Sequence, residues 1–177
     1  IDAGIEVDAA RSRYVARVET LTAEVGQALL GRPIGLRYRS GWRSGLSFPE
    51  ALAESAERDA TSGFTQVGPH RADLAVDLGG TPVADEASRG QQKLVAAALV
   101  LAQVKEREGD RDTVLLVDDP AAELDAGALR RLLAQLERLE CQQIYTGLSE
   151  DSLPHDPEFP VFHVEQGHIK ECYNDSV

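Results

Sequence analysis

The stretch from Ser88 to Asp125 most constrains how this 177-residue chain can fold. Ser88 has Gln91 three residues later, a spacing typical of a capping box, in which the serine hydroxyl caps the first turn of a helix. The cap therefore predicts a helix that begins at Arg89. Gly90 leaves that first turn without a bulky side chain, so its N–H groups are accessible to an anion such as a phosphate.

The second half of this stretch is a short apolar run, Val114–Val117, followed by Asp118 and Asp119. Such a run is typical of a parallel strand buried on both faces, and α/β proteins bind ligands at the carboxyl ends of these strands. One carboxylate could hold Mg²⁺ through water while its neighbour orients an attacking water. The alternative is that both acids only form a turn after the strand. An EF-hand is excluded, because no glycine stands at the required sixth position.

These segments resemble the motifs of ABC-type ATPase heads. Ala87–Gln91 is similar to the signature motif, Val114–Asp119 to the Walker B strand and Ala121–Asp125 to the D-loop. With Gly68–Leu74 added, the order and spacing resemble the RecF family, bacterial recombination-mediator ATPases related to the SMC proteins. The resemblance covers roughly residues 58–169.

The resemblance implies a role for each motif residue. Asp118 would hold Mg²⁺ through water, and Asp119 would orient the water that attacks ATP. Asp125 would couple two ATP sites, although it could merely cap the next helix. The residues expected to bind the γ-phosphate of ATP across a dimer interface are Ser88, Arg89, Gly90 and Gln91, and those of the D-loop are Ala122, Glu123, Leu124 and Asp125.

The P-loop pattern of such heads is missing, because the chain contains no Gly-Lys dipeptide. We therefore expect an α/β fold that forms the C-terminal half of an ABC-type head, with a parallel-sheet core and helices. Residues 1–60 would be part of a small helical lobe, and residues 61–177 the half-head. The fragment alone is predicted to be inactive as an ATPase.

Charge is unevenly distributed. The net charge is −12, which argues against a large nucleic-acid footprint, yet residues 1–47 contain seven arginines and five acids. The most basic stretch is a weakly alternating strand and its flanks, which could contact a DNA backbone or simply present a solvated face. Its arginines are Arg32, Arg37, Arg39 and Arg43.

By resemblance, His70 and Arg71 belong to the head near the signature. Arg71 could stabilise phosphate charge or pair with Asp73, and His70 is more simply explained as a hydrogen-bonded structural residue. Thr146 is followed by Gly147, where many ABC ATPases have a histidine that senses the γ-phosphate. This departure, and an aspartate at position 119 where many have glutamate, predict slow hydrolysis.

The function implied by the resemblance is an ATP-dependent DNA clamp of recombinational repair and replication. ATP would drive homodimerisation on duplex DNA near single-strand gaps and, with RecR and RecO, help to load RecA. Two alternatives are open: a non-catalytic DNA- or protein-interaction module with an ABC-type fold, and a transporter-type ATPase subunit. Two widely separated cysteines and the lack of a membrane-length apolar stretch favour a cytoplasmic protein without membrane contact.

Hydrophobic periodicity predicts the remaining elements. A first helix would bury a stripe of Tyr14, Val18, Leu21, Val25 and Ala28. The expected helices are 1–30, 48–60, 89–107 and 126–140; the expected strands are 34–42, 72–78, 114–119, 143–146 and 161–165, the last turning into 168–170. Residues 106–112 and 149–160 are expected to be surface loops.

Overall fold

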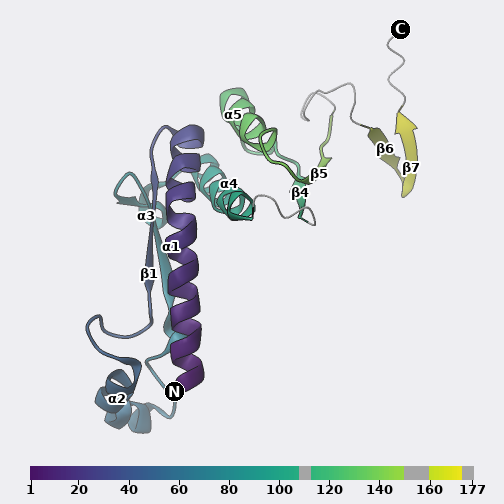
Figure 1. The fold of residues 1–177 in the computed structure, drawn as a ribbon. Helices are drawn as coiled ribbons and strands as arrows, with labels where there is room; N and C mark the ends of the chain where they lie inside the picture. Colours follow the sequence, from purple (N-terminus) through teal and green to yellow (C-terminus); the bar gives the residue numbers. More distant parts are fainter. Residues whose placement is uncertain (108–112, 150–159, 173–177) are drawn as a thin grey trace.

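The computed structural model describes residues 1–107, 113–149 and 160–172, and its elements follow the predicted order (Figure 1). These elements are α1 Asp2–Leu30, β1 Ile34–Arg39, α2 Phe48–Ser62, the 3-10 turn η1 Pro69–Arg71, β2 Asp73–Leu78, β3 Thr81–Pro82, α3 Val83–Glu86, α4 Arg89–Glu106, β4 Val114–Asp118, α5 Ala126–Leu136, β5 Gln142–Thr146, β6 Val161–Glu165 and β7 His168–Cys172. The two surface loops predicted from the sequence fall mainly on residues 108–112 and 150–159, outside the described residues.

Helix α1 is the longest element and ends at Gly31, whose backbone has φ 69° and whose N–H donates to the carbonyl oxygen of Gln27. The predicted apolar stripe is confirmed at Val18 and Val25 but is wrong at its end, where Leu29 is buried and Ala28 is exposed. The predicted stripe repeats every 3.5 residues, whereas an α-helix turns every 3.6, so its last position drifts off the buried face.

A three-stranded antiparallel sheet, β1-β2-β3, packs on α1 (Figure 1). β1 pairs with β2 over its whole length, from Ile34 opposite Leu78 to Arg39 opposite Asp73. Ile34 and Leu36 are buried, while Arg37 and Arg39, which alternate with them along the strand, are exposed, as predicted. Leu78 ends β2, and the turn at residues 79–80 leads into β3 as a hairpin.

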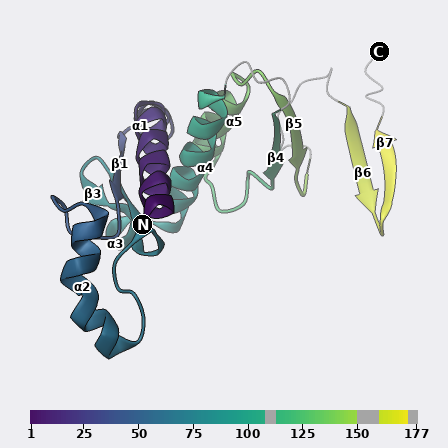
Figure 2. The same ribbon diagram turned by 60° about the horizontal axis from the view of Figure 1, so that its bottom comes forward.

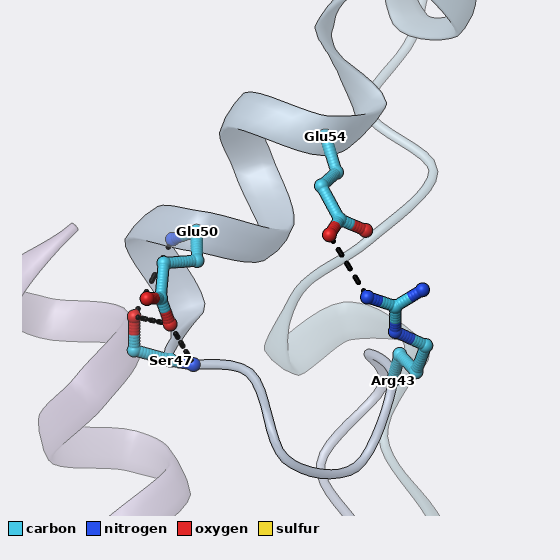
Figure 3. Close-up of polar contacts among 4 residues, drawn as sticks. All are labelled: Arg43, Ser47, Glu50 and Glu54. Carbon is cyan, nitrogen blue, oxygen red and sulfur yellow. Dashed lines mark hydrogen bonds and ion pairs between the residues drawn. The ribbon is translucent and has the colours of Figure 1, made fainter.

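Helix α2 begins with a complete capping box, shown in Figure 3. The N–H of Ser47 donates to Glu50 Oε2 at 2.8 Å, and the N–H of Glu50 donates back to Ser47 Oγ at 3.4 Å. In the same view, Arg43 Nη2 lies 2.9 Å from Glu54 Oε1, so an ion pair joins the preceding loop to the helix.

The core lies where α1, α4 and α5 meet, and both ribbon views place α4 and α5 between α1 and the β4–β5 pair (Figures 1 and 2). Ala98 on α4 is fully buried, and its small side chain allows α4 to pack close to α1. Arg131 Nε on α5 donates to the carbonyl oxygen of Leu29 at 2.8 Å and caps the end of α1. Elements on both sides of residue 60 thus share a core, and a domain division there stays a prediction.

Strands β4 and β5 are parallel, as predicted, with Asp118 opposite Thr146. The expectation that β4 is buried on both faces is wrong for this chain: Leu115 is buried, but Leu116 is 71% exposed and Val114 49% exposed. Among the described residues, Leu115 packs into the helical core while Leu116 and Ile144 stay exposed. The predicted closing hairpin is confirmed in β6–β7, which pair antiparallel around a turn at residues 166–167.

Candidate nucleotide-binding site

The N-terminus of α4 has the geometry that the signature-like sequence predicts. The N–H of Ser88 donates to Gln91 Oε1 at 2.9 Å, and the N–H of Gln91 donates to Ser88 Oγ at 3.3 Å. Within the described part of the chain, the N–H groups of Arg89 and Gly90 meet no protein acceptor. Two backbone donors at the positive end of an 18-residue helix are therefore available to an anion.

The carboxylates Asp118 and Asp119 lie at the carboxyl end of β4, beside the end of β5. The hydroxyl of Thr146 donates to Asp118 Oδ1. The N–H of Asp119 donates to the carbonyl oxygen of Thr146 and also to Thr146 Oγ1, each at 3.1 Å. Asp118 is exposed, and Asp119 has φ 41°, in the left-handed region that aspartate tolerates better than most residues.

Residues 119–125 form a tight turn rather than an open loop. The N–H of Ala122 donates to the carbonyl oxygen of Asp119 at 3.1 Å, and Glu123 has φ 63°. Asp125 Oδ1 accepts from the N–H of Ala128 at 2.8 Å and so caps α5. This backbone hydrogen bond holds the pKa of Asp125 below its ordinary value, with smaller help from Arg131 and Arg130.

The signature-like turn and the D-loop-like turn are in contact. Lys93 Nζ donates to the carbonyl oxygen of Asp119 at 3.3 Å and to that of Ala122 at 2.5 Å. A Cβ added to Gly90 would lie 3.4 Å from the carbonyl oxygen of Glu123, an ordinary van der Waals contact. The structure therefore brings together the predicted motifs of residues 88–91, 118–119 and 122–125.

His70 and Arg71 are not part of this cluster. They lie in η1, before β2, whereas the signature-like turn follows the opposite end of β2 and the β3 hairpin (Figure 1). Six residues of strand span about 20 Å. His70 Nε2 is 3.0 Å from the carbonyl oxygen of Thr65, and Arg71 lies over the ring of Phe64 with no ion pair to Asp73 in the described structure.

The four arginines of the basic stretch have different surroundings. Arg37 and Arg39 share the exposed face of β1 and have no ion-pair partner among the described residues. Arg43 is paired with Glu54. Arg32 lies against the β2–β3 turn, where its Nε would be 2.8 Å from a Cβ added to Gly79. Only Arg37 and Arg39 therefore combine exposure with a common strand face.

The carboxylates at the end of β4 fit the expected arrangement, in which Asp118 would hold Mg²⁺ through water. Among the described residues, no group of three or more histidine, cysteine, aspartate or glutamate side chains could hold a metal ion by itself. Mg²⁺ at nucleotide sites commonly binds one or two carboxylates, with water and phosphate oxygens completing the shell. The exposed carboxylate of Asp118 suits that arrangement, and the ion would neutralise phosphate charge there.

Comparison with solved structures identifies the fold. A RecF–ATP structure, described as the recombination mediator of the RecFOR pathway, superposes with TM-score 0.72 and 22% identity, covering 97% of this chain and 48% of that one. The corresponding RecF–ATPγS structure gives 0.71 and 23%, covering 95% and 47%. The fold is thus α/β, and this chain matches about half of each of these RecF structures.

Sequence comparison finds curated relatives that match almost the whole of this chain. The chain is 40% identical over 175 residues to the replication and repair protein RecF of Thioalkalivibrio sulfidiphilus, covering 96% of this chain and 48% of that protein. RecF of Pseudomonas fluorescens is 39% identical over 181 residues, with 97% and 49% coverage. The chain is therefore homologous to RecF along almost its entire length.

This chain spans about half the length of the curated RecF proteins that it matches. No protein-family model matches the sequence. In the described residues no helix is long and apolar enough to cross a membrane.

Two contributors to the site were missed by sequence reasoning. Lys93 was visible beside the signature-like motif, but its two carbonyl partners lie 26 and 29 residues away. In the sequence, Thr146 stands out only as the residue before Gly147. Its place opposite Asp118 follows from the parallel register, which sequence periodicity does not fix.

Proposed function

We propose that this chain supplies the signature, Walker B and D-loop portion of a RecF-like ATPase head, and that the complete protein is an ATP-dependent DNA clamp of recombinational repair and replication. Two heads would face each other so that each ATP lies between the P-loop of one subunit and the signature of the other. ATP binding would join the dimer, and slow, DNA-dependent hydrolysis would release it.

One observation carries this proposal: the first turn of α4 lies against the turn that follows the carboxylates of β4. Lys93 and Gly90 make that contact. A helix cap and a turn that served only the fold would not need to be in contact. An ATPase head, by contrast, needs a phosphate-binding helix end and a carboxylate pair on one rigid unit. The homology to RecF supports the same reading.

Each side chain would have a distinct task. The free N–H groups at Arg89 and Gly90, with the hydroxyl of Ser88, would bind the γ-phosphate held by the other subunit. Asp118 would hold Mg²⁺ through water, and Asp119 would orient the attacking water. Gly147, in the place of a histidine, leaves the γ-phosphate without that sensor, which is consistent with slow turnover.

DNA binding and partners complete the proposal. Arg37 and Arg39 would contact the phosphate backbone of duplex DNA near single-strand gaps. The two solved relatives are described as members of the RecFOR pathway. For this protein we propose RecR and RecO as partners and RecA loading as the outcome, in the cytoplasm.

The test uses the protein expressed from its complete reading frame. Asp119→Asn is expected to lower ATP turnover by about 100-fold, because the amide cannot orient water as a carboxylate does, while ATP-dependent dimerisation persists. Ser88→Arg is expected to abolish ATP-dependent dimerisation, because the arginine side chain would fill the space at the N-terminus of α4 that is proposed to receive the γ-phosphate. Glu86→Gln, outside both motifs, is the matched control.

The outcomes separate two functions. Loss of turnover in Asp119→Asn, with longer-lived DNA complexes, supports an ATPase clamp. Unchanged turnover and unchanged complex lifetime in both variants would overturn it and favour the non-catalytic interaction module.

A further inference from the structure

Lys93 connects two functional segments through one atom. It lies in the second turn of α4, is partly buried, and directs Nζ into the turn that follows β4. Its partners are the main-chain carbonyl oxygens of Asp119 and Ala122, at 3.3 and 2.5 Å, rather than a carboxylate. The carbonyl oxygen of Asp119 also accepts the N–H of Ala122, a hydrogen bond within the turn. The ammonium group of Lys93 adds a second link between the same two residues, through both of their carbonyl oxygens.

The contact fixes both ends of the turn. The turn begins at Asp119, which has φ 41°. Glu123, which has φ 63°, directly follows Ala122, whose carbonyl oxygen is the second acceptor of Lys93. Backbone in this region is unfavourable for residues with a Cβ and persists only where the surroundings hold it. A charge-assisted hydrogen bond to each carbonyl provides such support. The conformation that aims the carboxylate of Asp119 is thus tied to the helix that begins at Ser88.

A second lysine on the same helix shows that this is not a general feature of α4. Lys105 is also partly buried, and its Nζ donates to Gln135 Oε1 on α5 at 3.3 Å. That contact joins two helices and touches neither the carboxylate end of β4 nor the following turn. Lys105 therefore serves as a matched control for the loss of one lysine from α4.

We propose that Lys93 is a positioning residue that couples the two ATP sites of the dimer, an inference that rests on the proposed function. Within one subunit it joins Asp119 and the D-loop, which serve that subunit's own ATP, to the helix end that completes the partner's site. A shift of either segment therefore moves the other.

The test uses mixed dimers of the complete protein, purified through two different tags. Ser88→Arg in one subunit leaves a single working site, made from that subunit's carboxylates and the other subunit's signature. Lys93→Met is then placed either in the Ser88→Arg subunit, where it acts on Asp119, or in the other subunit, where it acts on the signature. Coupling predicts that kcat falls about tenfold in both arrangements, with KM for ATP unchanged.

Controls separate coupling from simple support of the fold. Lys105→Met is expected to leave kcat unchanged in both arrangements, and Lys93→Arg, which can still donate to both carbonyls, is expected to restore most of the turnover. If Lys93→Met does not fold, Lys93→Gln is measured in the same two arrangements.

A loss in only one arrangement, or in neither, would overturn the coupling. The failure of the proposed function would look different, because Ser88→Arg on its own would then leave ATP turnover unchanged.

Discussion

The hydroxyl of Thr146 donates to the carboxylate of Asp118 across the parallel strands β5 and β4. Oγ1 of the same threonine accepts the N–H of Asp119. One side chain therefore holds the metal-binding candidate and the water-orienting candidate in a fixed relation. Its position follows from the register, in which Asp118 and Thr146 are directly opposite.

Replacing Thr146 by valine should impair catalysis more than binding. Valine has nearly the same shape but neither donates to Asp118 nor accepts from Asp119. In the complete protein we expect kcat for ATP hydrolysis to fall by about tenfold, with KM changed less than twofold. Steady-state kinetics at saturating duplex DNA measures both. Thr146→Ser keeps the hydroxyl and should retain most activity; equal loss in both variants would exclude this role.

Arg37 and Arg39 should contribute to DNA affinity, whereas Arg43 should contribute less. The first two are exposed without ion-pair partners in the described structure, and Arg43 is already paired with Glu54. The double variant Arg37→Gln/Arg39→Gln should weaken binding to duplex DNA and reduce the slope of log K against log salt concentration by about 2. Fluorescence anisotropy over a salt series provides the measurement. Should Arg43→Gln have the larger effect, the DNA-contacting face would be elsewhere.

Asp125 should behave as a helix cap whose strength depends on pH. Its pKa lies below the ordinary value of 3.8, because the charged carboxylate accepts the N–H of Ala128. A lowered folded-state pKa means that this stabilisation is present above the ordinary value and is lost as the pH falls through the folded-state pKa. Asp125→Ala should lower Tm by about 2–4 °C at neutral pH.

Asp125→Asn retains the cap without the charge, so its stability should depend less on pH in the acidic range. NMR titration of the carboxyl group checks the pKa, and thermal unfolding checks the Tm. A carboxyl group that titrates at or above its ordinary value would contradict the capping role. The same variant also examines site coupling, because a pure cap predicts unchanged ATP turnover in Asp125→Asn.

Local patterns in the sequence were sufficient to predict most elements. The capping box at Ser88–Gln91 forms as its spacing predicts, a helix begins at Phe48 as expected, and β1 alternates as expected. These features depend on residues within four positions of each other, where geometry is set by the backbone. The site residues at the start of α4 and the end of β4 stay a prediction from the resemblance, and the structure places the two segments that carry them in contact.

Features that depend on distant partners could not be predicted. Lys93 reaches carbonyl oxygens, which every residue has, so no residue type marks its target. The apolar neighbours of Leu116 predict that it is buried, but in the structure it is exposed. Only tertiary packing decides which faces of a strand are covered. His70 and Arg71 lie far from the site because β2 carries the chain away from them, a matter of strand direction rather than composition.

The 29 residues of α1 make a stiff rod about 43 Å long, at 1.5 Å per residue. One end is fastened to α5 through Arg131, and α5 starts directly after the turn at residues 119–125. In the N-terminal half of the rod, Arg11 donates to the carbonyl oxygen of Pro69, the first residue of η1. A tilt of about 10° at the fastened end would displace the far end by about 7 Å, so α1 would act as a lever that magnifies a small motion beside the proposed nucleotide-binding site.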